Sequence, residues 1–190
     1  LATIANKIKY TTIDPEQGKF VPLGSEGITD DYLQTPREIL ENHPKGKAYA
    51  RLLKDLKKYP ILVDEEGLVL SMPPIINSEQ TKVVVDTESV FIDVTGLNER
   101  LVHKALNIIV TNLKEWNPSC SIESVHIKGP GKYEEITPNL EPELWDLNPD
   151  ECRKIIGVDL ANHEIIECLE KMRFSCDDKG NKITVKVPCY

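Results

Sequence analysis

Short apolar runs separated by polar turn residues recur along the chain. Residues 61–70, 82–94 and 122–128 contain such runs, which are typical of strands. We predict one hairpin within 61–70, turning at Asp64–Gly67, and another that joins 82–85 to 90–94. Residues 122–128 should form a further strand. Because tight turns join antiparallel strands, the sheet is predicted to be antiparallel or mixed.

A three-to-four-residue period of apolar positions predicts helices beside these strands. Thr35 is a candidate N-cap, with Pro36 at N1 and Glu38 completing a capping box, and this helix should end near residues 42–44. The apolar face of a second helix would consist of Tyr49, Leu52, Leu53, Leu56 and Tyr59. Asn98 should cap a long helix, whose buried stripe would consist of Leu101, Ala105, Ile109, Leu113 and Trp116.

The last third of the chain predicts a separate small module. Residues 129–149 are rich in proline and glycine, as connections are. Asn148 should cap a short helix, a second helix should cover about 162–172, and 182–187 alternates as a strand. The expected fold class is therefore α+β, with a mixed or antiparallel sheet packed against helices and then a small helical module with a β-hairpin. The expected domains are residues 1–140 and residues 146–190, the second truncated at its C-terminal end.

Two adjacent prolines, Pro73 and Pro74, interrupt the strand pattern. Neither can donate the N–H that a sheet ladder needs, so a rigid loop is predicted between sheet elements. Further on, Asp93 and Thr95 lie two residues apart on a predicted strand and therefore share one face. We predict that the proline loop and this strand form two walls of one pocket.

The composition predicts a globular protein without a membrane span. The chain has a net charge of −8, 40% hydrophobic and 28% charged residues, as in soluble globular domains. No apolar run reaches the roughly 20 residues of a membrane span, and no signal peptide is found. Its first residue is Leu1, and Tyr190 ends it within a strand pattern, so we expect a piece of a longer chain.

Cysteine usage indicates a reducing compartment. The five cysteines are odd in number and none falls in a C-x-x-C pair, which argues against a disulfide framework and a structural zinc site. The cytoplasm is the expected location. A local basic cluster of Lys54, Lys57 and Lys58 is interpreted either as the solvated face of a helix or as an RNA contact.

The segments Pro73–Asn77 and Phe91–Gly96 resemble the editing module of the phenylalanyl-tRNA synthetase beta subunit in its archaeal and eukaryotic form. The resemblance starts at Thr35–Leu40, continues through Tyr59–Leu62 and covers most of residues 30–128. In the family's order, 155–158 and 185–190 then resemble the small helical module that follows in the same subunit.

This resemblance implies hydrolysis of a wrong ester, tyrosine attached to the tRNA for phenylalanine. Tyrosine is larger than phenylalanine, so the site must recognise the phenol hydroxyl rather than exclude by size. A buried polar partner left unpaired by phenylalanine discriminates by roughly 10⁴–10⁵. Asp93 is the first candidate for that partner; otherwise it points outward or caps a loop. Glu79 is the second, although charged residues are common after loops.

Other residues are assigned by the same resemblance. Thr95 and Ser71 are the expected catalytic residues: Thr95 would position the attacking water or bind the ester carbonyl, unless it is only a strand former. Ser71 and Asn77 would bind the amino acid or the terminal adenosine, or would merely satisfy loop backbone groups. The remaining substrate-binding residues expected are Pro73, Pro74 and Leu62. No metal site is expected.

The chain shows no phosphate-binding glycine motif and no nucleophile elbow. The resemblance implies that the aminoacylation centre lies in the alpha subunit. This fragment is therefore expected to need no cofactor, whereas the complete synthetase uses ATP and magnesium. The expected partners are that alpha subunit and the tRNA 3′ end, without a membrane. The four histidines match no pocket position, which leaves only carboxylates as general bases. The alternative function is a non-catalytic scaffold that contacts tRNA.

Overall fold

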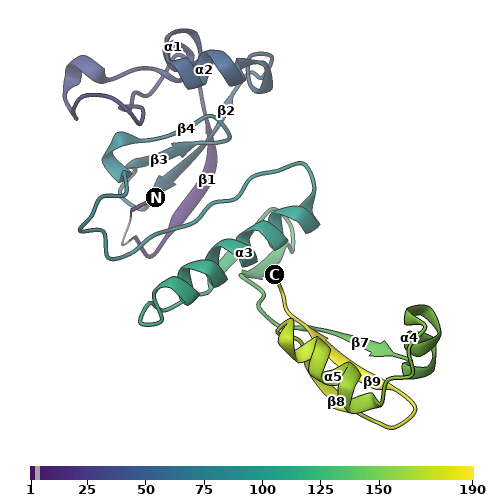
Figure 1. The fold of residues 1–190 in the computed structure, drawn as a ribbon. Coiled ribbons are helices and arrows are strands. Elements are labelled where there is room, and N and C mark those ends of the chain that lie inside the picture. Colours follow the sequence, from purple (N-terminus) through teal and green to yellow (C-terminus); the bar gives the residue numbers. More distant parts are fainter. Residues whose placement is uncertain (3–4) are drawn as a thin grey trace. The chain divides into compact units, whose positions relative to one another are not determined.

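The structure is a computed structural model that describes residues 1–2 and 5–190. It confirms the α+β class, with helices and antiparallel sheets in both parts of the chain (Figure 1). The chain divides into two compact units, residues 1–95 and residues 96–190. We call them the first and second units; the predicted boundary between residues 140 and 146 stays a prediction.

The first unit contains a four-stranded antiparallel sheet in chain order. Its strands are β1 (Ile8–Ile13), β2 (Tyr59–Asp64), β3 (Val69–Met72) and β4 (Ile76–Asn77). The predicted hairpin between β2 and β3 is confirmed. Its turn contains Gly67 at φ 87°, a left-handed conformation that glycine adopts without a steric penalty.

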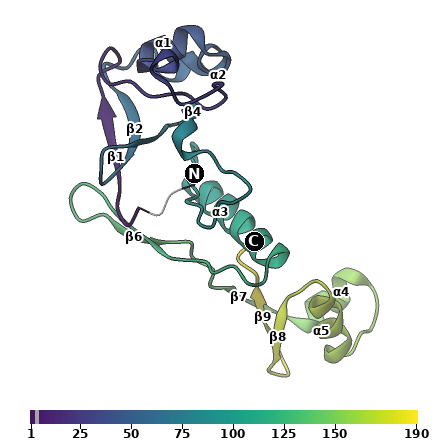
Figure 2. The ribbon, with the colours of Figure 1, turned by 90° about the vertical axis from the view of Figure 1, so that its left-hand side faces the viewer.

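Two short helices, α1 (Pro36–Asn42) and α2 (Pro44–Tyr49), lie side by side at one end of the β1–β2 pair (Figures 1 and 2). The predicted capping box is confirmed, because Thr35 Oγ1 accepts from Glu38 N and the Glu38 carboxylate accepts from Thr35 N. Short 3-10 helices cover Asp30–Tyr32, Ala50–Leu52 and Glu79–Thr81. The core consists of Phe20, Ile39, Leu40, Leu53, Tyr59, Met72, Ile75 and Ile76.

Two predictions for the first unit are wrong. The second helix does not continue to Tyr59: α2 ends at Tyr49, and Tyr59 is instead the first residue of β2. Residues 82–94 form no hairpin; among the described residues they make a single bridge, from Val90 to Ala2, and Val85 is fully exposed. The apolar side chains of 82–94 are largely exposed and hold no strand against the core, whereas after Leu52 the chain turns so that Tyr59 can begin β2.

The second unit begins with α3 (Glu99–Trp116), and the predicted cap is confirmed because Asn98 Oδ1 accepts from Leu101 N. The predicted buried stripe is wrong: Leu101 and Trp116 are exposed, and α3 buries Asn107 and Val110. Asn107 Nδ2 donates to the carbonyl of Asn139 at 2.8 Å, so the covered side of α3 includes a polar contact.

Two sheets accompany α3. One is the hairpin β5 (Val125–Lys128) and β6 (Glu134–Thr137), and the other has the order β7 (Glu143–Leu147), β9 (Ile183–Val187), β8 (Ser175–Asp178). Strand β5 confirms the later part of the predicted 122–128 strand. Strands β6 and β7 lie within 129–149, so the expectation that this segment is only a connection is wrong.

The small module at the end of the chain has the predicted helices, α4 (Pro149–Ile156) and α5 (Asn162–Lys171). Asn148 caps α4, and the predicted inward side of α5 packs on β9 through Ile165, Ile166 and Leu169. Within the described residues, no helix has the length and apolar character of a membrane span, and no three potential ligand side chains gather as a metal site.

Candidate functional site

The proline loop is the short connection between β3 and β4. Ser71 pairs with Asn77 and Met72 with Ile76, and Ile75 N donates to Met72 O at 2.8 Å to close the turn. Pro73 and Pro74 therefore occupy a tight reversal that needs no ladder donor from either ring. Because directly paired residues lie on the same face of a sheet, Ser71 and Asn77 project to one side.

Both Ser71 and Asn77 line a cavity of about 240 Å³. It is lined by Leu23, Lys45, Ser71, Pro73, Pro74, Ile75, Ile76, Asn77, Asp93 and Thr95. Six of the eight predicted site residues thus line one cavity, although the segment that carries Asp93 and Thr95 belongs to no sheet. Their roles remain predictions.

Ser71 forms the interior part of this lining. The residue is 4% exposed, and its hydroxyl donates to the carbonyl of Ile76 at 3.3 Å. A serine hydroxyl that donates one bond still offers lone pairs to a ligand donor. Ser71 is therefore held in one orientation by the hairpin and can accept a hydrogen bond from an ammonium or hydroxyl group in the cavity.

Asp93 contributes the negative charge of the cavity. Displacement of water by neighbouring groups raises the pKa of its carboxyl. Burial, and then the charge of Asp93, also raise the pKa of Tyr10 on β1. Asp93 is nevertheless an exposed residue, so the buried position expected for the partner of the phenol is wrong. Its carboxyl is reachable from solvent and can accept a hydrogen bond from a ligand hydroxyl.

A second cavity, of about 270 Å³, lies in the small module and is lined by Asp146, Leu147, Asn148, Glu151, Cys152, Ile155 and Ile156. Two of its polar side chains are already used within the module: Asp146 accepts from Lys182 and Thr184, and Asn148 caps α4. Its composition does not point to chemistry.

Comparison with known proteins decides the family. The chain is 43% identical over 179 residues to the phenylalanine–tRNA ligase beta subunit of Methanosphaera stadtmanae, covering 94% of the chain and 30% of that protein. It is 41% identical to the beta subunit of Archaeoglobus fulgidus, covering all of the chain and 33% of that protein. The chain belongs to the phenylalanyl-tRNA synthetase beta-subunit family. It spans about a third of the length of the curated relatives it matches.

Two further comparisons agree. Residues 145–190 match the family model of the tRNA synthetase B5 domain. A crystal structure of an N-terminal fragment of the phenylalanyl-tRNA synthetase beta subunit from Pyrococcus horikoshii matches with a TM-score of 0.89 at 41% identity. That match covers 98% of this chain and 51% of the other.

Two predicted site residues of this beta-subunit region, Leu62 and Glu79, lie outside the cavity lining. Leu62 is buried in β2 and pairs with Ser71 of β3 through the backbone. The Glu79 carboxylate accepts from Gly24 N at 2.8 Å and from Lys82 Nζ at 2.8 Å. Leu23 lines the cavity and directly precedes Gly24. The hydrogen bond from Gly24 to Glu79 therefore holds this part of the cavity wall in place.

We expect Glu79→Ala to lower the free energy of unfolding by about 1–2 kcal/mol, because two charge-assisted hydrogen bonds disappear. Those bonds lower the pKa of the Glu79 carboxyl. A lowered carboxyl pKa stabilises the fold above the ordinary glutamate pKa of about 4.3, and the contribution is lost as the pH falls through the folded-state value. Urea unfolding followed by circular dichroism at pH 7 and pH 3 measures both effects.

Glu88→Ala, in an exposed loop of the same unit, is the matched control and should change the free energy of unfolding by less than about 0.5 kcal/mol. Equal losses for the two variants at pH 7 would contradict the role assigned to Glu79.

Four lining residues were not among the predicted site residues: Leu23, Lys45, Ile75 and Ile76. Leu23 reaches the cavity because its N–H donates to the carbonyl of Asn77 at 2.9 Å, a contact between distant parts of the chain. Lys45 does carry a local signal. It lies in the first turn of α2, where the helix dipole disfavours a positive charge, and such conflicts with local preference often mark function.

Proposed function

We propose that the first unit is the editing site of a phenylalanyl-tRNA synthetase beta subunit and hydrolyses the ester of tyrosine on the tRNA for phenylalanine. The observation that carries this proposal is the convergence of Asp93, Thr95, Ser71 and Asn77 on one cavity beside a rigid proline loop. These are the residue types that a tyrosyl ester needs: acceptors for its phenol and amino group, and hydroxyl and amide groups for its carbonyl and a water.

In this mechanism Asp93 accepts the hydrogen bond of the phenol hydroxyl. Phenylalanine offers no such donor and forgoes this charge-assisted hydrogen bond, which favours the binding of tyrosine. Pro73 and Pro74 form the wall against the ring, and Asn77 and Ser71 bind the amino end of the amino acid or the terminal adenosine. Thr95 holds the attacking water or polarises the ester carbonyl, and placement supplies most of the acceleration.

The rest of the assembly follows from the same proposal. The aminoacylation centre, with its ATP and magnesium, belongs to the complete synthetase and its alpha subunit, and this fragment needs no cofactor. The chain carries a net charge of −8, so the remainder of the synthetase holds the body of the tRNA while only the 3′ end reaches this cavity. As part of the translation apparatus, the protein is placed in the cytoplasm.

A non-catalytic scaffold is the second candidate. One observation favours it. Within the described residues, the cavity lining contains no histidine, and Asp93 is its single carboxylate. When Asp93 binds the phenol, the lining offers no separate general base. A scaffold would leave the hydrolysis of tyrosyl-tRNA unaffected by changes at the cavity.

We expect Thr95→Val in the complete synthetase to lower kcat for deacylation of tyrosyl-tRNA at least about 10-fold, because the side chain keeps its shape but loses the hydroxyl that orients water or carbonyl. Thr95→Ser restores the hydroxyl and should retain most of the activity. Release of labelled tyrosine measures both. If Thr95→Val and Asp93→Ala both deacylate at the wild-type rate, the scaffold is favoured.

A further inference from the structure

The surface beside the cavity carries a concentration of positive charge that the proposed hydrolysis leaves unused. Between residues 45 and 58 there are six basic side chains and one acidic side chain, Asp55. The other residues of the first unit contain five basic and fourteen acidic side chains. We call this segment the basic run; its cations are Lys45, Lys47, Arg51, Lys54, Lys57 and Lys58.

These six cations are not used inside the protein. All are exposed, and among the described residues none makes an ion pair or a side-chain hydrogen bond. By contrast, the first unit's Arg37 and Lys82 pair with Glu16 and Glu79. Six unpaired like charges on fourteen residues repel one another, which destabilises the segment unless an anion neutralises them.

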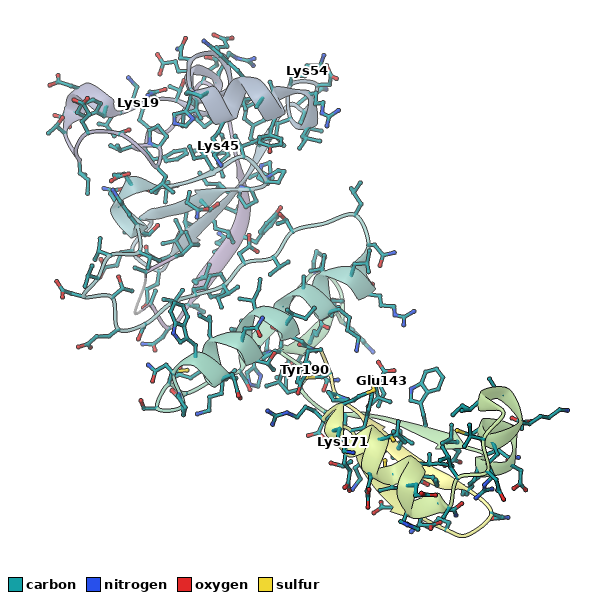
Figure 3. The ribbon with its side chains drawn as sticks, viewed as in Figure 1. Lys19, Lys45, Lys54, Glu143, Lys171 and Tyr190 are labelled. Carbon is teal, nitrogen blue, oxygen red and sulfur yellow. The ribbon has the colours of Figure 1, made fainter. Side chains whose placement is uncertain are left out.

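Two residues of the basic run, Lys45 and Leu53, connect it to the cavity or to the core beneath the cavity. Lys45 itself lines the cavity together with Asp93 and Thr95. Farther along, Leu53 is 3% exposed and lies in the core cluster that contains the cavity residues Ile75 and Ile76. Figure 3 shows Lys45 beneath α2, towards the strands, and Lys54 at the far end of the same helical layer. The run therefore leads from the cavity outwards.

Exposed flat and apolar side chains alternate with the cations. Tyr49 is 45% exposed, and Leu52 and Leu56 are each 49% exposed. These apolar residues were expected on the buried face of a helix, and the structure instead leaves them exposed among the cations. Cations that track a phosphate backbone, interleaved with an aromatic ring on which a base can stack, are the elements of a single-strand nucleic-acid surface.

We propose that the basic run binds the phosphates of the single-stranded 3′ end of the tRNA, with Lys45 next to the last phosphate and Tyr49 as a stacking surface for a base. The inference rests on the proposed function only for the identity of the RNA. It assigns to residues 45–58 the task of delivering the ester to the cavity, and it predicts their effect on KM rather than on chemistry.

The test uses the triple variant Lys54→Gln, Lys57→Gln, Lys58→Gln, which leaves every cavity residue in place. The control triple, Lys154→Gln, Lys171→Gln, Lys179→Gln, removes the same charge from exposed, unpaired lysines of the second unit. Each is assayed in the complete synthetase with two substrates: tyrosyl-tRNA, and tyrosyl-adenosine, an ester on a single nucleoside without phosphate.

For tyrosyl-tRNA, the basic-run variant should raise KM about 10-fold with little change in kcat. A plot of log kcat/KM against log salt should become shallower by about 2, since each lost phosphate contact on a single strand contributes about 0.7. Hydrolysis of tyrosyl-adenosine should not change. A KM and salt slope equal to those of the control triple would overturn the proposal, as would an equal loss on both substrates, which would indicate damage to the cavity.

A binding measurement separates this inference from the editing proposal. Fluorescence anisotropy of a labelled ACCA tetranucleotide, titrated with the 190-residue chain, should show salt-dependent binding that the basic-run variant loses and the control triple keeps. If the wild-type synthetase hydrolyses neither ester, the editing proposal fails while this titration still decides the RNA surface. Wild-type binding no stronger than that of the basic-run variant would overturn the proposed RNA surface. The cations would then serve solubility or bind an acidic protein.

Discussion

Asp93→Ala in the complete synthetase should lower kcat/KM for deacylation of tyrosyl-tRNA by about 100-fold. A hydrogen bond to a charged group contributes about 1.5–3 kcal/mol, and 1.4 kcal/mol corresponds to a factor of ten. Both the affinity for the phenol and the orientation of the ester depend on this contact. The measurement is release of labelled tyrosine from tRNA at limiting enzyme.

The control for Asp93 is Asp86→Ala, which removes the same charge from an exposed position on the same loop segment, outside the cavity lining. It should deacylate at the wild-type rate. If both variants lose activity equally, the effect comes from general charge rather than from a contact with the phenol.

The same contact gives a pH dependence whose sign follows from the environment of Asp93. Because desolvation raises the pKa of the Asp93 carboxyl, the ionised acceptor is lost at a higher pH than for an ordinary aspartate, near 3.9. Activity should therefore fall on acidification with a midpoint above that value. Asp93→Asn should show a low rate without this acidic limb; an unchanged limb in Asp93→Asn would assign the titration to another group.

Gly46→Ala should lower the free energy of unfolding by about 3 kcal/mol or more. A Cβ at this position would lie 1.8 Å from the carbonyl oxygen of Ile39 and 2.6 Å from its carbon, both backbone atoms of α1. Backbone of a packed helix cannot rotate away as a side chain does, so α1 and α2 must separate and expose core surface. Urea unfolding followed by circular dichroism measures the loss.

Gly27→Ala is the matched control, since its new Cβ would come no closer than 4.0 Å to the Tyr32 ring. It should be within about 0.5 kcal/mol of wild type. Gly46→Ala should also weaken deacylation, because α2 carries the cavity residue Lys45. A fully stable Gly46→Ala variant would contradict the close packing of the two helices.

Local chemistry explains the parts of the fold that could be predicted. Thr35 with Glu38, Asn98 and Asn148 each satisfy backbone N–H groups of the helix that they begin, and that requirement is complete within four residues of sequence. The β2–β3 hairpin follows from short apolar runs on both sides of a turn that ends with Gly67. Such features hold whatever the rest of the chain does.

The predictions that were wrong concern elements that depend on contacts between distant parts of the chain. Alternation in 82–94 indicated strands, yet a strand needs a partner, and the available pairing partner was Ala2, at the other end of the unit. The spacing of Leu52 and Leu56 suggested a helix, but the chain there has to turn in order to begin β2 at Tyr59. In α3 the covered residues are Asn107 and Val110, and Asn107 contacts Asn139, 32 residues further along the chain. Each outcome depends on contacts that no local window contains.

For the candidate site, the sequence alone was sufficient to indicate the proline loop and the pair Asp93 and Thr95 as walls of one pocket. That was possible because two adjacent prolines exclude a ladder and an acidic residue in an apolar segment is unfavourable without a purpose. Only the tertiary structure decided that Leu23 and Lys45 complete the lining and that Glu79 supports it from behind. The reason is physical: a cavity is formed by surfaces brought together from distant positions, and the free energy that joins them comes from the buried core rather than from the local sequence.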